Sequence, residues 1–213
     1  MLDELMVESV TNTNKKLFAF GCSCTVGEYL PGWQAATLEN NWQTKLSDDA
    51  WPFVLARKLC MSQVENKAWG GDSNHEIMHK ILLTDFQPGD IAVIGWSYAG
   101  REITFHPKGI ITQTMWGPNA ERFYAAHDIE DLELKSMEYV HHIQLYLKSL
   151  SVKYVMAAVE TWNFKTPQWR FYNPDDFVFY NFIDRALDNE HPGLRSHAEL
   201  ADQIYQRLGV ISN

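Results

Sequence analysis

The chain has 213 residues, of which 46% are hydrophobic and 21% charged, a composition typical of a globular protein with one sizeable core. Its formal net charge of -9 argues against a nucleic-acid partner, which would need a basic face for phosphates, and more weakly against an anionic membrane surface. The three cysteines cannot all pair with one another, and their spacing is not that of a zinc site, so we expect no metal and no cofactor.

Residues 1–14 are expected to form a flexible tail. They contain acidic residues and lack the apolar segment of a signal peptide. No apolar run approaches the roughly 20 residues that a membrane-spanning helix needs. We therefore expect a cytoplasmic protein without a membrane partner, with a single domain over residues 15–213.

Apolar segments and amphipathic segments alternate along this domain. In chain order we expect a strand at Lys16–Gly21, a helix at Trp51–Cys60, a strand at Gln63–Ala68, a helix from Ser73 or Asn74 to Leu83, a strand at Asp90–Trp96, a helix at Leu132–Leu150, a strand at Lys153–Val159 and a helix at Glu199–Gly209. Strands separated by helices need crossover connections. The predicted fold class is therefore a three-layer α/β/α domain with a mainly parallel sheet of about five strands.

Two longer segments, residues 100–131 and 160–190, lack clear periodicity. Each follows a predicted strand, so both are expected over the same rim of the sheet. Long loops at such a rim often act as lids or binding loops.

The stretch LFAFGCSCTVG places Ser23 directly after the first predicted strand, where sites gather in parallel sheets. A serine hydroxyl is a poor nucleophile until a base takes its proton. Asp188 and His191 lie three residues apart, so one short turn can place the carboxylate beside the imidazole and fix its tautomer. Serine, aspartate, histidine is one recognised chain order for this machinery.

Several stretches together resemble the SGNH/GDSL hydrolase family of esterases and acyl hydrolases. Three family blocks have counterparts: G-D-S at Gly21-Cys22-Ser23, N-x-G-x-x-G-D at Asn66, Ala68, Gly71 and Asp72, and D-x-x-H-P at Asp188 and His191-Pro192. The family's third block, G-x-N-D, differs because Ser97 stands where asparagine is expected. The stretches FGCSCT, WPFVLARKL, GGDSN and GWSYAGRE resemble a divergent set often carried by tailed phages and marine microbes.

This resemblance implies a flavodoxin-like sheet and assigns roles to site residues. Ser23 would be the nucleophile, His191 the general base and Asp188 the acid that orients it. The backbone N–H groups of Ser23 and Gly71 would form part of an oxyanion hole.

The asparagine missing from the third block leaves the oxyanion hole short of one donor. Loss of such a donor typically costs roughly 2.7–4 kcal/mol of activation free energy. Asn74 and Ser97 are the candidate replacement donors. Arg101 either binds a polar or anionic substrate group or forms a surface ion pair with Glu102.

Each candidate residue also has a structural interpretation. Ser23 could cap the following helix. Cys22 and Cys24 are best explained as small packing residues. His197, the rival of His191, is expected to cap or pack at the start of the last helix.

Other histidines and the tryptophans are assigned mainly to packing. The pairs His75/His79 and His141/His142 are interpreted as structural or solvated, because no third metal ligand is evident. Six tryptophans fall at predicted strand ends or in loops, where packing or stacking against sugar rings would use them: Trp33, Trp69, Trp96, Trp116, Trp162 and Trp169.

The predicted function is a serine esterase that removes a small acyl group, such as acetyl, from a carbohydrate or small-molecule ester without a cofactor. The alternative is an SGNH-fold binding or structural module with little or no catalysis, associated with a phage particle. A thiol redox protein is a weaker third hypothesis, because the chain lacks C-x-x-C.

Overall fold

The computed structural model describes residues 15–37, 44–106, 109–113, 117, 120–159 and 176–210. The expected tail at residues 1–14 lies outside this set, as do residues 160–175 of the second irregular segment. Trp116, Trp162 and Trp169 also lie outside the described residues.

The described elements alternate as the sequence predicts, with several additions. In order they are β1 (Lys16–Gly21), α1 (Ser23–Val26), α2 (Trp51–Lys58), β2 (Gln63–Asn66), α3 (Asn74–Leu82), β3 (Ile91–Gly95), β4 (Glu102–His106), β5 (Gly109–Gln113), α4 (Ala120–Ala125), α5 (Ile129–Ser149), β6 (Lys153–Val159), β7 (Phe177–Tyr180) and α6 (Leu194–Val210).

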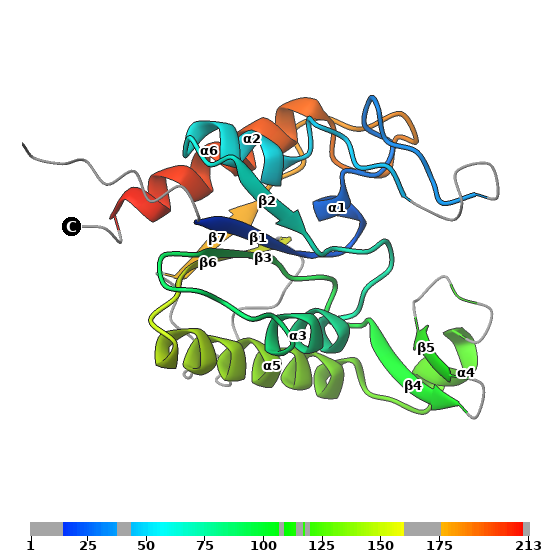
Figure 1. Cartoon of the computed structure of the whole chain (residues 1–213). Helices are drawn as coiled ribbons and strands as arrows, with labels where there is room; N and C mark the ends of the chain where they lie inside the picture. Colours follow the sequence, from blue (N-terminus) through cyan, green and yellow to red (C-terminus); the bar gives the residue numbers. More distant parts are fainter. Residues whose placement is uncertain are drawn as a thin grey trace, which may run out of the picture.

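A parallel sheet of five strands forms the centre of the molecule, in the order β2-β1-β3-β6-β7. Helices α2 and α6 cover one face, and α3 and α5 cover the other (Figure 1). The predicted α/β/α class is thus confirmed, and the strand order is the flavodoxin-like one. β1 lies between β2 and β3, so the order of the strands reverses at β1. Ligand sites in such sheets form where the order reverses.

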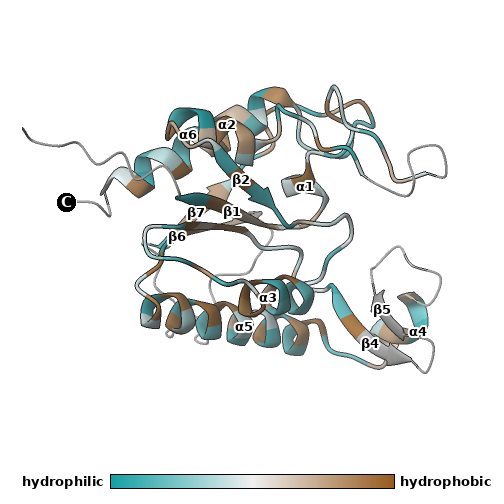
Figure 2. Cartoon of the chain, in the orientation of Figure 1, coloured by the Kyte–Doolittle hydropathy of each residue, from teal (hydrophilic) through white to brown (hydrophobic). Residues whose placement is uncertain are grey.

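Alternating side chains of the strands build two cores, one on each face. Leu17 and Ala19 of β1 pack with residues of α2 and α6, whereas Phe18 and Phe20 pack with residues of α3 and α5. This is the period of two that a strand covered on both faces requires. Figure 2 colours the same elements by hydropathy, and the inner strands of the sheet carry mostly hydrophobic residues. The sheet is therefore packed against helices on both faces, which fixes the position of the rim where its strands end.

The ends of two helices are fixed by side chains. Ser73 caps α3, where its hydroxyl accepts a hydrogen bond from Glu76 N and Glu76 Oε2 accepts one from Ser73 N. Helix α6 begins at Leu194 rather than at the expected Glu199, and Gly209 lies inside it. The earlier start follows from Asp184, whose carboxylate accepts hydrogen bonds from the backbone N–H groups of Arg195 and Ser196.

The remaining differences lie in the two irregular segments and after β1. The segment 100–131 contains the β4–β5 hairpin and α4, and the segment 160–190 contains β7. Helix α1 and strand β7 have four residues each, too few for a hydrophobic period to be recognised. Among the helices of the described residues, none combines the length and the apolar character needed to cross a membrane.

Candidate active site

Ser23 is the first residue of α1 and is 5% exposed. The N-cap position belongs to Cys22, whose side chain makes no capping hydrogen bond. Ser23 therefore does not cap the helix, and its position directly after a central strand is one in which a nucleophile can be presented at the rim.

Two glycines at neighbouring strand ends let α1 pack against the sheet. Gly21 and Gly95 face each other in the register of β1 and β3. A Cβ atom on Gly21 would lie 2.0 Å from Thr25 Oγ1, and one on Gly95 would lie 2.6 Å from the same atom. Steric crowding thus explains why the G-C-S stretch begins with glycine, because a larger residue would push α1 and Ser23 away from the sheet.

The loop after β2 runs beside the turn that carries Ser23. Lys67 N donates to Ala19 O at 2.8 Å, and Trp69 N donates to Gly21 O at 3.3 Å. Asn66 Nδ2 donates to Thr25 O at 3.0 Å, which joins the loop directly to α1. These bonds bring the second sequence block alongside the first.

Gly71 lies in this loop with φ +86°, a conformation that favours glycine. Within the described residues, neither Gly71 N nor Ser23 N donates to a protein acceptor. Both N–H groups thus remain available to an acceptor on a ligand.

Asp72 braces the same loop from a buried position. Its Oδ2 accepts from Trp69 N at 3.0 Å and from Lys80 Nζ of α3. Burial raises the pKa of Asp72 from 3.8 to about 6, although the bond with Lys80 opposes the change. The loop is therefore tied to α3 as well as to β1.

His191 and Asp188 form a hydrogen-bonded pair on the loop before α6. His191 Nδ1 and Asp188 Oδ2 are 2.5 Å apart, and Asp188 Oδ1 accepts from the backbone N–H groups of Glu190 and His191. Burial opposes ionisation of Asp188, but these hydrogen bonds prevail and hold its pKa below the ordinary value. The carboxylate is thus placed to fix the His191 ring and to stabilise its imidazolium form.

Backbone hydrogen bonds close the loop that carries this pair. Ala186 N donates to His191 O at 2.9 Å, and Gly193 N donates to Asp184 O at 3.1 Å. The Tyr29 ring lies 5.2 Å from the His191 ring, measured between centroids. The loop is therefore held at its base and against the segment that follows α1.

Ser23 and His191 line one pocket at the rim of the sheet, with a volume of about 340 Å³. Its lining residues are Ser23, Cys24, Tyr98, Arg101, Phe182, Glu190 and His191. No hydrogen bond joins Ser23 Oγ to the His191 ring, and His191 Nε2 faces Glu28 Oε2 at 3.9 Å. Catalytic hydrogen bonds are often long before substrate binds, so this geometry is compatible with proton transfer.

Glu28 was not among the predicted site residues. It is half-buried, and burial raises its pKa while the nearby His191 lowers it. The one feature of the sequence that could have pointed to Glu28 is its position five residues after Ser23, just beyond the end of α1.

Asn74 and Ser97 are bonded to each other rather than facing the pocket. Asn74 Nδ2 donates to Ser97 O at 3.2 Å and to Ser136 Oγ at 3.1 Å, and Asn74 Oδ1 accepts from Ser97 N at 2.8 Å. Both amide hydrogens of Asn74 are therefore used within the fold, and its observed contacts join α3 to the end of β3. We do not retain it as an oxyanion donor.

Arg101 lines the same pocket as Ser23. Its Nη1 donates to Ser97 Oγ at 3.0 Å, and its guanidinium lies 5.3 Å from the Tyr98 ring centroid. Ser97 thereby anchors a cation close to Ser23.

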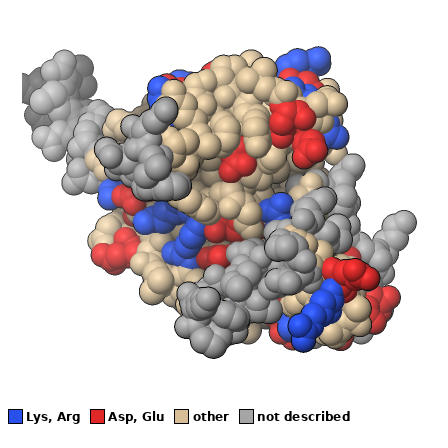
Figure 3. All heavy atoms as spheres, turned by 90° about the vertical axis from the view of Figure 1, so that its right-hand side faces the viewer, with Lys and Arg blue, Asp and Glu red and all other residues tan. Residues whose placement is uncertain are grey.

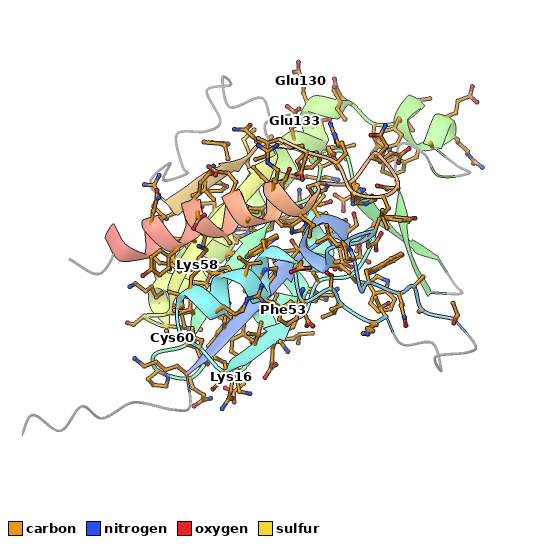
Figure 4. All side chains as sticks on the ribbon, turned by 90° about the horizontal axis from the view of Figure 1, so that it is seen from above. Lys16, Phe53, Lys58, Cys60, Glu130 and Glu133 are labelled. Atoms are coloured by element: carbon orange, nitrogen blue, oxygen red, sulfur yellow. The ribbon has the colours of Figure 1, made fainter. Side chains whose placement is uncertain are left out.

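The cysteines occupy two separate places. Cys22 and Cys24 are buried in the core beneath α2 and α6, as their interpretation as packing residues requires. A hydrogen bond with Cys22, together with burial, raises the pKa of the Cys24 thiol well above its ordinary value, so Cys24 is a poor thiolate nucleophile. Cys60 is exposed and lies at the end of the molecule where β1 begins, near the labelled Lys16 (Figure 4).

His197 packs at the start of α6, as expected, and it also caps another helix. It is fully buried, and its Nδ1 accepts a hydrogen bond from Trp51 N, at the beginning of α2, at 3.0 Å. Burial lowers its pKa from 6.5 to about 4. His197 is therefore a neutral structural residue.

The His75/His79 pair also has structural contacts. The two rings are 5.7 Å apart, and His75 Nδ1 lies 3.7 Å from Glu102 Oε1. Within the described part of the chain, no group of three His, Cys, Asp or Glu side chains is placed to hold a metal ion.

Comparisons with known proteins agree on the fold. No protein-family model matches the sequence, and no curated protein matches it either. Among solved structures, a protein assigned to the G-D-S-L lipolytic family from Desulfitobacterium hafniense DCB-2 is similar at 12% identity with a TM-score of 0.51, covering 91% of this chain and 99% of that one.

Two esterase structures are similar to the same degree. An acetyl xylan esterase from Geobacillus stearothermophilus has 14% identity and a TM-score of 0.51, with 92% of this chain and 95% of that chain covered. A carbohydrate esterase, described as having an active site with divergent catalytic and non-catalytic binding functions, has 13% identity and a TM-score of 0.55. The chain matches 65% of that protein's length, and 92% of this chain is covered. The chain thus has the SGNH/GDSL hydrolase fold, as its sequence predicts.

Proposed function

We propose that the protein is a serine esterase that removes a small acyl group, such as acetyl, from a carbohydrate or small-molecule ester. The observation that carries the proposal is a single pocket lined by Ser23 and His191, with Asp188 2.5 Å from the far nitrogen of the histidine. A nucleophile, a base and an acid that orients the base are the groups that acyl transfer through serine needs. The esterases among the similar structures support the same reaction class.

In the proposed mechanism, His191 Nε2 takes the proton of Ser23 as Ser23 Oγ attacks the ester carbonyl. The N–H groups of Ser23 and Gly71 donate to the oxyanion, and the Arg101 guanidinium in the same pocket adds positive charge where the negative charge develops. His191 then protonates the leaving alkoxide. Water, activated by the same nitrogen, hydrolyses the acyl-enzyme and returns the proton to Ser23.

A second candidate function is a binding module without catalysis. Ser97 replaces the third-block asparagine, and Asn74 does not replace it because its amide is already bonded. One of the similar esterases is itself described with both catalytic and non-catalytic binding functions. On this view, the pocket binds an ester or a sugar without cleaving it.

Labelling with a fluorophosphonate probe tests the first proposal. We expect a covalent adduct on Ser23 in the wild-type protein, and hydrolysis of p-nitrophenyl acetate that disappears in Ser23→Ala. Ser151→Ala, outside the pocket, is the matched control and should keep both. Absence of the adduct and of turnover with acyl chains of several lengths would leave the binding module as the better proposal.

A further inference from the structure

A second and larger pocket lies beside the loop that contains Gly71, with a volume of about 650 Å³. This volume is within the range of roughly 300–1,000 Å³ found for small-molecule sites. Its lining includes Val26, Glu28, Trp33, Asn66, Trp69 and Gly70. Glu28 is the one charged residue among them, so the described lining has no cation to attract an anionic ligand.

Two connections join this pocket to His191. Glu28 lines the second pocket, and its Oε2 lies 3.9 Å from His191 Nε2. The Tyr29 ring lies between two others, 4.8 Å from the Trp33 ring and 5.2 Å from the His191 ring. The second pocket therefore opens next to the nitrogen that handles the proton.

The chemistry of the proposed reaction fixes which half of an ester occupies which pocket. The leaving oxygen must come within hydrogen-bond reach of His191 Nε2, because that nitrogen protonates it. The atom that Nε2 faces across 3.9 Å is Glu28 Oε2, which belongs to the second pocket. The alcohol half then extends toward Glu28, and the small acyl half remains in the first pocket with Arg101 and Phe182.

The glycine at position 70 allows Glu28 to take this place. A Cβ atom there would lie 2.0 Å from Glu28 Oε1. The carboxylate is thus held between the backbone of the Gly71 loop and His191. Burial raises the pKa of Glu28, and the nearby His191 only partly opposes this change.

The remaining surface of the second pocket suits a sugar ring. Trp69 is 54% exposed, so its indole face is open to solvent. The side-chain amide of Asn66 already makes hydrogen bonds within the fold: its Nδ2 donates to Thr25 O, and its Oδ1 accepts from Ala68 N. In Figure 3, which looks onto the rim where the strands end, most of the described upper surface is uncharged. An exposed aromatic face beside one acceptor favours a ring with apolar C–H faces and hydroxyl groups.

We propose that the second pocket binds the alcohol half of the substrate, a neutral sugar, which stacks on Trp69 and donates a hydroxyl hydrogen bond to Glu28. This inference rests on the proposed esterase function for the placement of the two halves. It predicts selectivity for sugar esters over simple alkyl esters.

A comparison of two acetate esters tests the selectivity. Acetylated methyl β-xylopyranoside can fill the second pocket, whereas ethyl acetate cannot. The ratio of kcat/KM for the sugar ester to that for ethyl acetate should fall about tenfold in Trp69→Ala, equivalent to about 1.4 kcal/mol, and several-fold in Glu28→Gln. Tyr205→Ala, which removes an exposed aromatic side chain from α6, should leave the ratio at the wild-type value. Unchanged ratios in both pocket variants would overturn the inference.

Acetylcholine serves as the charged counterpart in the same assay. If the wild-type protein prefers acetylcholine to the sugar ester and Glu28→Gln removes that preference, the pocket binds a cation and the assignment to a neutral sugar is wrong. Preference for the sugar ester supports it.

Binding separates failure of this inference from failure of the esterase proposal. Methyl β-xylopyranoside should shift the indole N–H signal of Trp69 in an NMR titration of Ser23→Ala, with no shift of the signals of Trp51, which is buried in the core between α2 and the sheet. This shift supports the sugar site even if no ester is cleaved. Its absence, with ester hydrolysis intact, overturns the sugar site alone.

Discussion

Two histidines six positions apart occupy very different environments. His191 lies on a partly exposed loop, pairs with Asp188 and lines the pocket that contains Ser23. His197 lies fully buried in the first turns of α6 and accepts a hydrogen bond from Trp51 N. The same side chain thus lies in a pocket beside a carboxylate at one position and is kept neutral by burial at the other. The difference shows that burial and the hydrogen-bond partner, rather than residue type, decide what a histidine can do.

The largest expected effect comes from replacing each of the two histidines with alanine, because one change should lower activity and the other should lower stability. His191→Ala should reduce kcat roughly 10⁶-fold, as loss of the base does in serine hydrolases, with little change in Tm. His197→Ala should instead destabilise the fold by about 2–4 kcal/mol, through the cavity and the lost helix cap, while the folded fraction keeps its kcat. Activity per folded molecule and thermal unfolding measure the two effects. If His197→Ala abolishes kcat at full folding, the division of roles between the two residues is wrong.

Asp188→Asn tests whether the His191 loop acts through a charged partner. The amide cannot stabilise the imidazolium and favours the wrong tautomer, so kcat should fall about 10⁴-fold. Glu199→Gln changes an exposed carboxylate on α6 that does not line the pocket; it is the control, expected to stay within a few-fold of wild type. Equal losses in both variants would show that no specific pair orients the ring.

The buried histidine should leave a signature in the pH dependence of stability. The folded protein holds the His197 proton less tightly than the unfolded chain, because its pKa is about 4 rather than 6.5. Its contribution, on the order of 3 kcal/mol, is therefore complete above pH 6.5 and is lost as the pH falls toward 4.

Asp72 acts in the opposite sense over nearly the same range. Its pKa is raised from 3.8 to about 6, so the folded protein binds this proton more tightly and loses roughly 3 kcal/mol of stability as the pH rises through 6. We expect the two contributions to offset each other in the wild-type protein. Urea unfolding between pH 4 and 6.5 should show stability falling with rising pH in His197→Asn, and falling with decreasing pH in Asp72→Asn. Parallel pH profiles in the two variants would contradict this opposition.

The smallest expected effect lies at Asp184, which connects the two regions. Its carboxylate accepts hydrogen bonds from Arg195 N and Ser196 N at the start of α6, and its backbone carbonyl accepts one from Gly193 N. Asp184→Ala should destabilise the protein by about 1 kcal/mol, the usual value of a helix cap. Since the same change loosens the base of the His191 loop, kcat should fall a few-fold as well. Asp202→Ala on α6 is the control. An equal effect in that variant would show that the hydrogen bonds of Asp184 make no particular contribution.

The sequence predicted much of the fold because its longest elements carry strong periods. The strands Lys16–Gly21 and Lys153–Val159 were predicted with the bounds observed, and the long helix α5 was placed within three residues at its start. The start of α6 was missed because Asp184, ten residues before Leu194, supplies the hydrogen bonds that extend the helix, and such a partner has no local signal. Strands β4, β5 and β7 lie in segments without clear periodicity.

For the candidate site, the sequence supplied residues and the tertiary structure supplied their neighbours. The spacing of Asp188 and His191 was enough to predict their hydrogen bond, because three residues can close one turn. The position of Ser23 after a central strand likewise follows from the chain order of the elements. That Asn74 bonds to Ser97, or that Glu28 faces His191, depends on contacts between distant segments.

The sequence by itself determined the parallel α/β fold, the strand end that carries Ser23 and the local Asp188–His191 pair. These features depend on hydrophobic period and on short-range spacing, which a sequence displays directly. Only the tertiary structure decided that Ser23 and His191 line one pocket, that His197 caps α2, and that Glu28 joins the first pocket to the second. Such relations arise from packing between segments far apart in the chain, and burial sets the protonation of each group only after that packing is complete.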